Sequence, residues 1–168
     1  MALVYYLGPS GGTGGGVVDP RDPSHQPAQI DFTPTITGFR TVNDVFAKDD
    51  CRISEMIINS GLDIDSITVS YVGDTADMAY GSYKMGGNGG GEHIIQLAKG
   101  EYLTRIIGEY SDVVKNLQYW TSRGVSGALG TSGAVNFDYQ APAGYQIIGF
   151  WGGSGAYIDR IGVAIRTV

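Results

Sequence analysis

Two segments of this chain repeat each other, and this repetition restricts the fold more than any other feature of the sequence. Residues 60–69 (SGLDIDSITV) and 154–163 (SGAYIDRIGV) share six of ten positions, including a glycine followed four residues later by an aspartate. The glycine run at residues 11–16 (GGTGGG) likewise resembles the run at 86–91 (GGNGGG). Self-similarity of this kind predicts like units that pack with pseudo-symmetry.

A third copy of the repeat is ambiguous. Asp112 lies midway between Asp65 and Asp159, and it follows Gly108 at the same spacing. Aligning the strands that follow moves the match by about two residues, and the glycine loop at 124–133 has no Gly-Gly pair. The outer two copies are therefore the better supported.

Short runs of β-branched and aromatic residues dominate the chain. They occupy residues 2–7, 28–39, 52–60, 66–72, 93–98, 101–108, 113–121, 134–139, 145–151 and 160–168. Glycine accounts for 27 of 168 residues, well above its usual share of about 7%, and it fills most gaps together with Ser, Asn and Asp. This pattern predicts an all-β sandwich, barrel or prism. Residues 41–50 alone tolerate a helix, and the proline-rich residues 17–27 are expected to form a loop.

Charge and cysteine content argue against several classes of function. The net charge is −6 and the sequence pI is about 4.7, whereas nucleic-acid binding favours a basic face. A single cysteine, Cys51, cannot form an intrachain disulfide, and His25 and His93 have no metal-site spacing. No apolar run approaches the roughly 18 residues typical of a transmembrane helix. The first residues resemble no secretion signal, which predicts a cytoplasmic or non-classically secreted protein.

A glycine loop beside one carboxylate is suited to binding hydroxyl groups. Glycine lets the backbone approach a ligand closely, and a carboxylate accepts two O–H bonds at once. Either element alone is typical of an ordinary turn, but their joint recurrence favours a ligand site. The loop lacks the Gly-Lys-Ser/Thr ending of a phosphate loop, and no Ser-His-Asp or Cys-His set is present. The sequence therefore predicts a binding protein with no enzyme activity, cofactor or metal.

Three segments resemble the jacalin-related lectins, which have the β-prism I fold. They are residues 7–16 (LGPSGGTGGG), 100–124 (GEYLTRIIGEYSDVVKNLQYWTSRG) and 147–165 (IIGFWGGSGAYIDRIGVAI). The resemblance implies an all-β fold of three four-stranded antiparallel sheets with pseudo-threefold symmetry. It also implies reversible, metal-independent binding of sugars. The single-chain form resembles the mannose/glucose-specific branch of the family.

The resemblance further implies which residues bind sugar. The first site would comprise Gly15, Ser111, Asp112, Ala156, Tyr157 and Asp159. Backbone N–H groups of the glycine and of the turn would donate to the sugar, and Asp159 would accept from two hydroxyls. The second copy of the repeat implies a second site, comprising Gly90, Leu62, Asp63 and Asp65. A third site, by the same logic, is a weaker expectation.

Two departures from the family pattern stand out. Ser10 replaces the usual tryptophan, so the packing beneath the first glycine loop is expected to differ. Residues 17–50 are longer than the family normally allows, which predicts one lectin domain over residues 1–168 with an atypical insertion. The expected partners are glycans or glycoproteins, with homo-oligomerisation. The competing hypothesis is a structural or protein-interaction β-prism with vestigial sugar sites.

Overall fold

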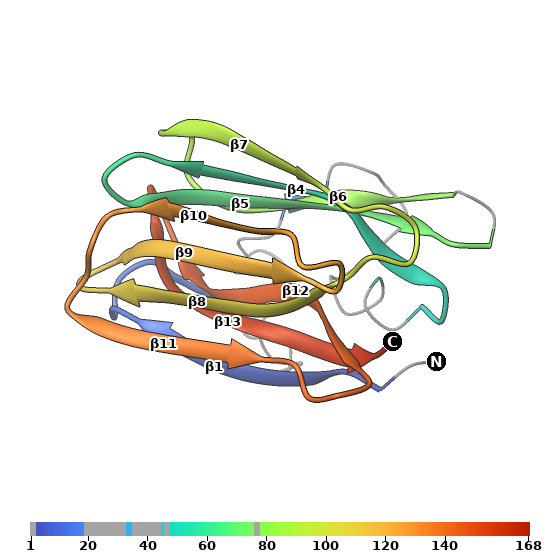
Figure 1. Cartoon of the computed structure of the whole chain (residues 1–168). Helices are drawn as coiled ribbons and strands as arrows, with labels where there is room; N and C mark the ends of the chain where they lie inside the picture. Colours follow the sequence, from blue (N-terminus) through green and yellow to red (C-terminus); the bar gives the residue numbers. More distant parts are fainter. Residues whose placement is uncertain (1–2, 19–32, 35–44, 46–47, 76–77) are drawn as a thin grey trace.

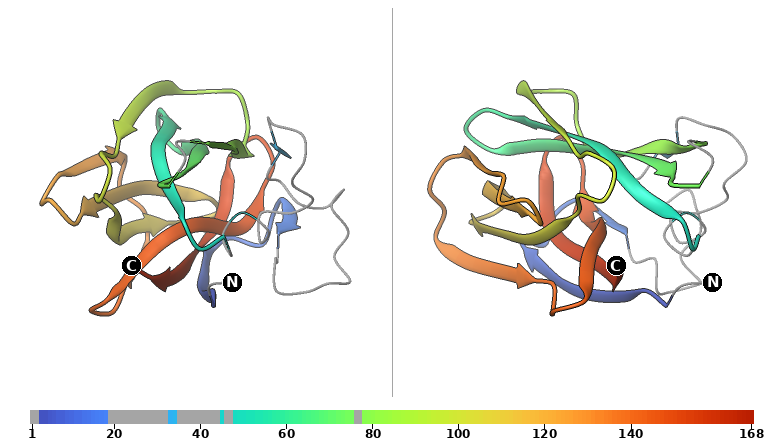
Figure 2. Two further views of the ribbon diagram at one scale, coloured as in Figure 1. Left: turned by 90° about the vertical axis from the view of Figure 1, so that its right-hand side faces the viewer. Right: turned by 45° about the vertical axis from the view of Figure 1, so that its right-hand side comes forward.

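A computed structural model describes residues 3–18, 33–34, 45, 48–75 and 78–168. Thirteen β-strands lie in this part of the chain, and every pair of neighbouring strands in the sheets is antiparallel. The views in Figures 1 and 2 show the strands wrapped as three sheets around a common interior. The three predicted four-stranded antiparallel sheets of a β-prism are confirmed.

The first sheet runs in the order β1 (Tyr5–Gly11), β13 (Ile158–Thr167), β12 (Tyr145–Ser154) and β2 (Gly16–Val18). The second has the order β10 (Ser126–Gly130), β9 (Val114–Thr121), β8 (Leu103–Tyr110) and β11 (Val135–Gln140). The third has the order β6 (Ala79–Gly86), β5 (Ile64–Gly73), β4 (Cys51–Ser60) and β7 (Gly91–Gln96), with β3 (Thr33–Pro34) added at β6. A single bridge, Ile147 to Leu103, joins the first two sheets.

The three sheets share one local plan. Each has a central hairpin (β12–β13, β8–β9 or β4–β5) whose tight turn is closed by a backbone hydrogen bond of 3.0 Å. The donors are Gly155, Ser111 and Gly61, and the acceptors are the carbonyls of Tyr157, Val113 and Asp63. A loop joins the two edge strands of each sheet. The repeats in the sequence therefore correspond to the turns and loops of pseudo-symmetric sheets.

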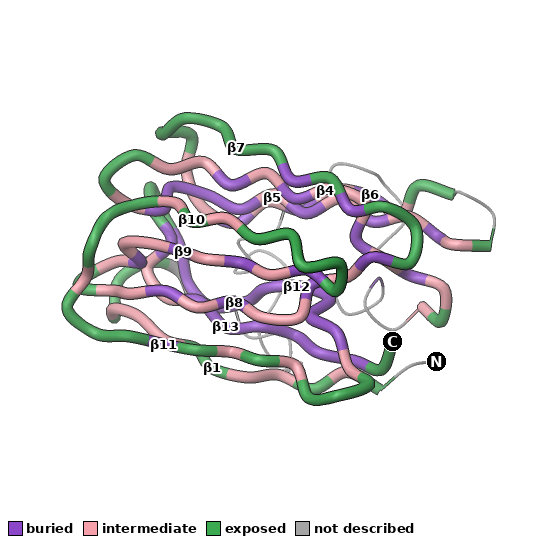
Figure 3. Tube along the Cα trace, in the orientation of Figure 1, coloured by how far each residue is buried: buried purple, intermediate pink, exposed green. Residues whose placement is uncertain are grey.

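Alternating side chains fill the interior of the prism. β4 and β9 bury every second or third residue, whereas β12 and β13 are buried along most of their length (Figure 3). Tyr71 on β5 donates its hydroxyl to the Ile148 carbonyl on β12 at 2.8 Å, which satisfies a buried polar atom and ties two sheets together. Trp151 donates its indole N–H to the Leu7 carbonyl at 3.1 Å.

The edge strands are where the sequence pattern failed. β2, β6 and β10 were not predicted as strands, and Val17 and Val18 belong to β2 and not to a loop. These strands are short or rich in glycine and serine, so their alternation of apolar and polar residues is weak. The remainder of the predicted loop and strand at 17–39, apart from β3, lies outside the described residues, as does most of the helix-tolerant segment 41–50.

The last part of the predicted insertion, residues 45 and 48–50, packs against the prism. Val45 is fully buried. Arg166 donates to the carbonyls of Lys48 and Asp49, at 2.7 Å to the second of these. Cys51, which begins β4, is buried, and burial raises the pKa of its thiol to about 12. Ser10, at the usual tryptophan position, shares a hydrogen bond with the hydroxyl of Tyr139.

Candidate functional site

In each sheet, the loop between the two edge strands lies against the turn of the central hairpin. We call each such loop and turn together a corner of the prism. The first corner consists of residues 11–16 and the turn 155–159, and the second of residues 86–91 and the turn 61–65. The third consists of residues 130–135 and the turn 111–115. All three have the same backbone contact, since Gly12, Gly87 and Thr131 donate their N–H groups at 2.8–2.9 Å to the carbonyls of Asp159, Asp65 and Lys115.

At the first corner, the glycine loop lies directly against the carboxylate of Asp159. A methyl group on Gly14 would lie 2.7 Å from Asp159 Oδ1, and one on Gly15 would overlap Oδ2. Gly15 has a φ of +73°, which L side chains rarely adopt. Two independent constraints therefore require glycine here, namely the backbone angle and the absence of space for a side chain.

At the second corner, the same arrangement is built from different residues. A methyl group on Gly89 would lie 2.6 Å from Asp65 Oδ1, and one on Gly90 would lie 2.5 Å from Oδ2. Gly90 has a φ of +78°. The loops and carboxylates that the repeats predicted to lie together are therefore adjacent at both corners.

The third corner corrects the sequence alignment. The turn bond from Ser111 to Val113 aligns Lys115, and not Asp112, with Asp65 and Asp159. The shift is three residues, where the flanking strands had suggested about two. Asp112 matches Ala156 and Leu62 instead, so its spacing in the sequence was coincidental.

Asp112 nevertheless lies beside the first corner, and Ser111 precedes it in the same turn. A side chain on Gly12 would collide with the carbonyl of Asp112. Gly87 approaches the Ala156 carbonyl in the same way, so each loop also packs against the turn of a neighbouring corner.

The two corners differ in the side chains at their rims. Tyr157 is 42% exposed at the first corner, and Leu62 is 76% exposed at the second. Asp63, which matches Tyr157, forms an ion pair with Lys115. The first corner thus has an aromatic rim and the second has an aliphatic and charged one.

The surroundings of the Asp65 carboxyl disfavour its ionised form and raise its pKa. The side chain is 7% exposed. Burial is the main cause that raises its pKa above the usual value, the nearby charge of Asp63 adds to the rise, and a hydrogen bond with the backbone at Gly61 opposes it. Burial of an ionised acceptor is costly unless it is compensated, and such a group is more common at binding sites than in purely structural turns.

Side chains outside the predicted set hold the glycine loops in place. Arg160 donates to the Gly14 carbonyl at 2.5 Å in the first corner. In the second corner, Lys84 donates to the Asn88 side chain at 2.8 Å. Sequence reasoning missed both residues, although the position of Arg160 directly after Asp159 was an available signal.

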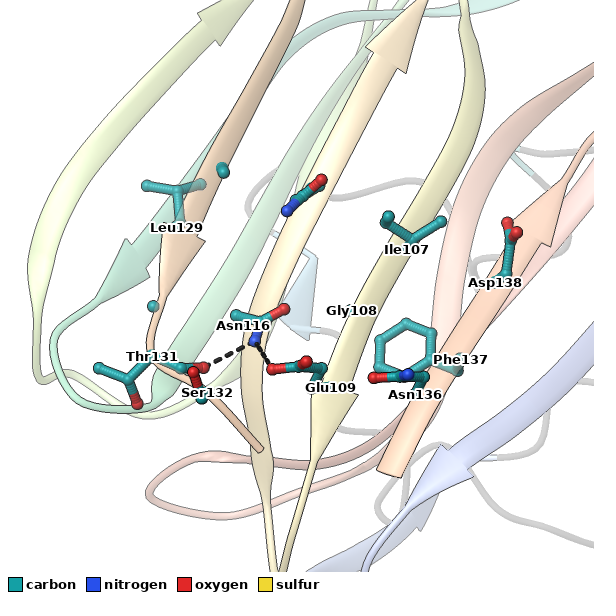
Figure 4. A pocket seen from close by; sticks show the side chains of 13 residues that line it. Ile107, Gly108, Glu109, Asn116, Leu129, Thr131, Ser132, Asn136, Phe137 and Asp138 are labelled. Carbon is teal, nitrogen blue, oxygen red and sulfur yellow. Dashed lines mark hydrogen bonds between the residues drawn. The ribbon is translucent and has the colours of Figure 1, made fainter. Parts of the chain in front are cut away.

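A cavity of about 690 Å³ lies on the outer face of β8, β9, β10 and β11, where Gly130, Thr131 and Ser132 of the third corner help to line it (Figure 4). Several of its polar side chains already have partners within the protein. Asn116 donates to Glu109 and to the Thr131 carbonyl, and Arg105 pairs with Asp138. The first two corners differ from this cavity, because each places one carboxylate directly against a loop of glycines.

Within the described residues, no group of three His, Cys, Asp or Glu side chains could hold a metal ion. No helix in the same part of the chain is long and apolar enough to cross a membrane.

A β-prism that presents carboxylates against side-chain-free loops is the architecture of one class of carbohydrate-binding proteins, the β-prism lectins. The Jacalin-like lectin domain family matches residues 7–164, and the chain belongs to this family. Horcolin from Hordeum vulgare subsp. vulgare is 34% identical over 119 residues, which cover 68% of this chain and 82% of horcolin. The family match favours carbohydrate binding over the competing hypothesis of an interaction module with vestigial sites.

Solved structures agree on the fold. Wild-type Malaysian banana lectin superimposes with a TM-score of 0.70 at 24% identity, with 100% of both chains covered. AcmJRL, a mannose-binding jacalin-related lectin from Ananas comosus, also has a TM-score of 0.70 at 24% identity, with 98% of this chain and 99% of that chain covered.

Proposed function

We propose that this lectin binds mannose- or glucose-type glycans reversibly at two corners of the prism, without a metal ion and without catalysis. The observation that carries the proposal is the pairing of Asp159 with Gly15 and of Asp65 with Gly90. Each pair combines a carboxylate with a backbone that no side chain shields. The description of the Ananas comosus relative as mannose binding supports the choice of sugar.

At the first site, Asp159 accepts hydrogen bonds from two adjacent sugar hydroxyls. The backbone N–H groups of Gly15, Ala156 and Tyr157 donate to hydroxyl oxygens, and Ser111 and Asp112 line the neighbouring edge. Sugar hydroxyls both donate and accept, so a fixed carboxylate flanked by fixed donors matches them. The exposed ring of Tyr157 offers an apolar surface to a pyranose.

At the second site, Asp65 is the acceptor and Gly90, Leu62 and Asp63 supply the backbone donors. Leu62 replaces the aromatic rim with an aliphatic one. The two sites are therefore expected to differ in preference for the sugar that follows the bound residue, while sharing the same primary sugar.

A glycan array followed by calorimetry with methyl α-mannoside and methyl α-galactoside tests the proposal. We expect binding of mannose- or glucose-terminated glycans and two sites per chain. Binding of galactosides alone would contradict the sugar assignment, and no binding to any glycan would contradict the function. Two sites on one chain already permit multivalent binding, and homo-oligomerisation would strengthen it; sedimentation equilibrium measures the oligomeric state.

Replacement of Asp65 by asparagine is expected to leave the melting temperature at pH 7 unchanged or higher. An acid whose pKa is higher in the folded protein binds its proton more tightly there, so its ionisation at neutral pH costs folding stability. Asparagine removes that cost and still accepts from the backbone. Calorimetric melting between pH 3 and pH 7 measures it, and the advantage of the variant should shrink as the pH falls through the Asp65 pKa. A marked loss of stability would contradict this account of Asp65.

Acid should weaken sugar binding at the second site, because it protonates the Asp65 carboxylate. In an Asp159→Ala protein, which retains only the second site, we expect sugar affinity to fall as the pH is lowered through a midpoint above 3.8, the usual aspartate value. The reason is that a protonated carboxyl loses one acceptor oxygen and its charge. Calorimetric titration across this range measures the midpoint, and a midpoint at or below the usual value would contradict the account.

A further inference from the structure

The third corner retains the backbone of a sugar site but neither of its binding groups. Lys115 stands where the other corners have Asp159 and Asp65, so the acceptor is replaced by a cation. Ala134 stands where they have Gly15 and Gly90, and its N–H already donates to the Tyr110 carbonyl at 3.0 Å and to the Ser111 hydroxyl at 3.2 Å.

Two side chains of this corner, Lys115 and Thr131, reach the turn of the second site. The ammonium group of Lys115 pairs with the carboxylate of Asp63, and the pair is largely shielded, with the two side chains 26% and 19% exposed. The hydroxyl of Thr131 donates to the Leu62 carbonyl at 2.7 Å. Asp63 and Leu62 belong to the turn whose N–H groups are assigned above to sugar binding.

The equivalent positions in the other loops cannot make the Thr131 contact. Gly12 and Gly87 stand in place of Thr131, and each approaches a carbonyl so closely that a side chain would collide with it. The third loop therefore replaces a close backbone contact with a directed hydrogen bond.

A network of side chains makes the third corner rigid. Asn116 donates to the Thr131 carbonyl at 2.7 Å and to Glu109 Oε2 at 2.6 Å (Figure 4). The N–H of Gly133 donates to the same carboxylate oxygen at 2.9 Å. The hydrogen bond from Gly133, followed by that from Asn116, holds the pKa of Glu109 below its usual value. Glu109 is therefore a charged acceptor, and charge-assisted bonds of this kind are stronger than neutral ones.

We infer that the third corner is a strut that positions the sugar-binding turn of the second site, with Lys115 and Thr131 as its two contacts. The ion pair fixes Asp63, the hydrogen bond fixes Leu62, and the 109–116–131 network supplies a rigid base. The inference rests on the proposed function of the second site. The first site has no such dependence, because the position of Asp63 is occupied there by the uncharged Tyr157.

The strut also has an electrostatic effect on the second site. Asp63 is the charged neighbour that disfavours ionisation of Asp65, and Lys115 is the cation that faces Asp63. The positive charge of Lys115 offsets the negative charge of Asp63, which helps Asp65 to remain an ionised acceptor. Lys115 is thus a positioning residue for the second site even though it contacts no sugar.

The test compares Lys115→Met and Lys115→Arg in two backgrounds, Asp159→Ala, which retains the second site, and Asp65→Ala, which retains the first. In the Asp159→Ala background, calorimetry with methyl α-mannoside should show a three- to tenfold lower affinity for the Lys115→Met variant and an affinity near that of Lys115 for the Lys115→Arg variant. In the Asp65→Ala background, neither substitution should change the affinity. Addition of Asp63→Asn to Lys115→Met should cause no further loss, because the two residues act as a pair.

Amide hydrogen exchange provides a readout that needs no sugar. The Gly61 N–H, bonded to Asp63, should exchange faster in Lys115→Met, while the matching Gly155 N–H, bonded to Tyr157, should be unchanged. Equal exchange of Gly61 in Lys115→Met and wild type, with normal affinity at the second site, would overturn the strut. An Asp159→Ala protein that binds no sugar while its Gly61 exchange still responds to Lys115→Met would instead overturn the proposed second site alone.

Discussion

The Asp65→Ala, Asp159→Ala double variant is expected to lose glycan binding, and each single variant to lose one of two sites. Removal of a carboxylate that accepts two sugar hydroxyls costs about 1.5–3 kcal/mol, which corresponds to roughly a ten- to hundredfold loss of affinity at that site. Calorimetry measures both the affinity and the number of sites, and the stoichiometry should fall from two to one in each single variant.

Asp138→Ala is the matched control for these variants. Asp138 pairs with Arg105 on an exposed strand face, so its loss removes a carboxylate and one negative charge away from the corners. Its binding should equal that of the wild type. Two full-affinity sites retained in the double variant would reject both assignments, whereas an equal loss in Asp138→Ala would point to net charge and not to the corners.

Gly15→Ala and Gly90→Ala are expected to block their sites sterically. The added methyl group would enter the space between loop and carboxylate, overlapping Asp159 Oδ2 in one case and lying 2.5 Å from Asp65 Oδ2 in the other. The left-handed backbone angle adds about 1–2 kcal/mol of strain. We expect at least a roughly tenfold loss of affinity at the altered site and a melting temperature lower by a few degrees.

Gly144→Ala separates the two effects in these variants. Gly144 has a φ of +83°, close to those of Gly15 and Gly90, but an added methyl group there meets nothing within 4 Å. It should therefore lower the melting temperature through backbone strain and leave sugar binding intact. If Gly144→Ala also lost sugar binding, the loss of affinity in Gly15→Ala and Gly90→Ala would be due to general destabilisation. If Gly15→Ala kept its affinity, the first site would not use the space between Gly15 and Asp159.

The sequence predicted the central hairpins of the prism well because their residues face a buried interior. In β4, β5, β9 and β13, β-branched and aromatic residues recur with the regularity that burial imposes. β6 and β10 lie farther from the centre of their sheets and contain glycine, so packing there selects side chains less strongly. Pattern alone could not identify them.

The candidate sites were predictable where sequence repetition followed structural repetition. The spacing from Gly61 to Asp65 recurs from Gly155 to Asp159 because both hairpins have turns of the same length. The third turn also has this length, but Ser111 and Lys115 stand in place of the glycine and the aspartate. Asp112 therefore drew the alignment to the wrong position, and only the backbone hydrogen bonds reveal the correct one.

The contacts between corners could not be predicted from the sequence. Lys115 and Asp63 are distant in the chain and share no motif, and the same holds for Thr131 and Leu62. Their proximity arises because each glycine loop packs against the turn of a neighbouring corner. Such a relation depends on how three sheets close around one axis and not on any local pattern.

A crystal structure of the protein with methyl α-mannoside tests the central claim most directly. The account predicts sugar density at two corners, with hydroxyls within hydrogen-bonding distance of Asp159 and of Asp65, and no sugar beside Lys115. Density confined to the cavity on the outer face of β8–β11, or a sugar bound at the third corner with the first two empty, would contradict it.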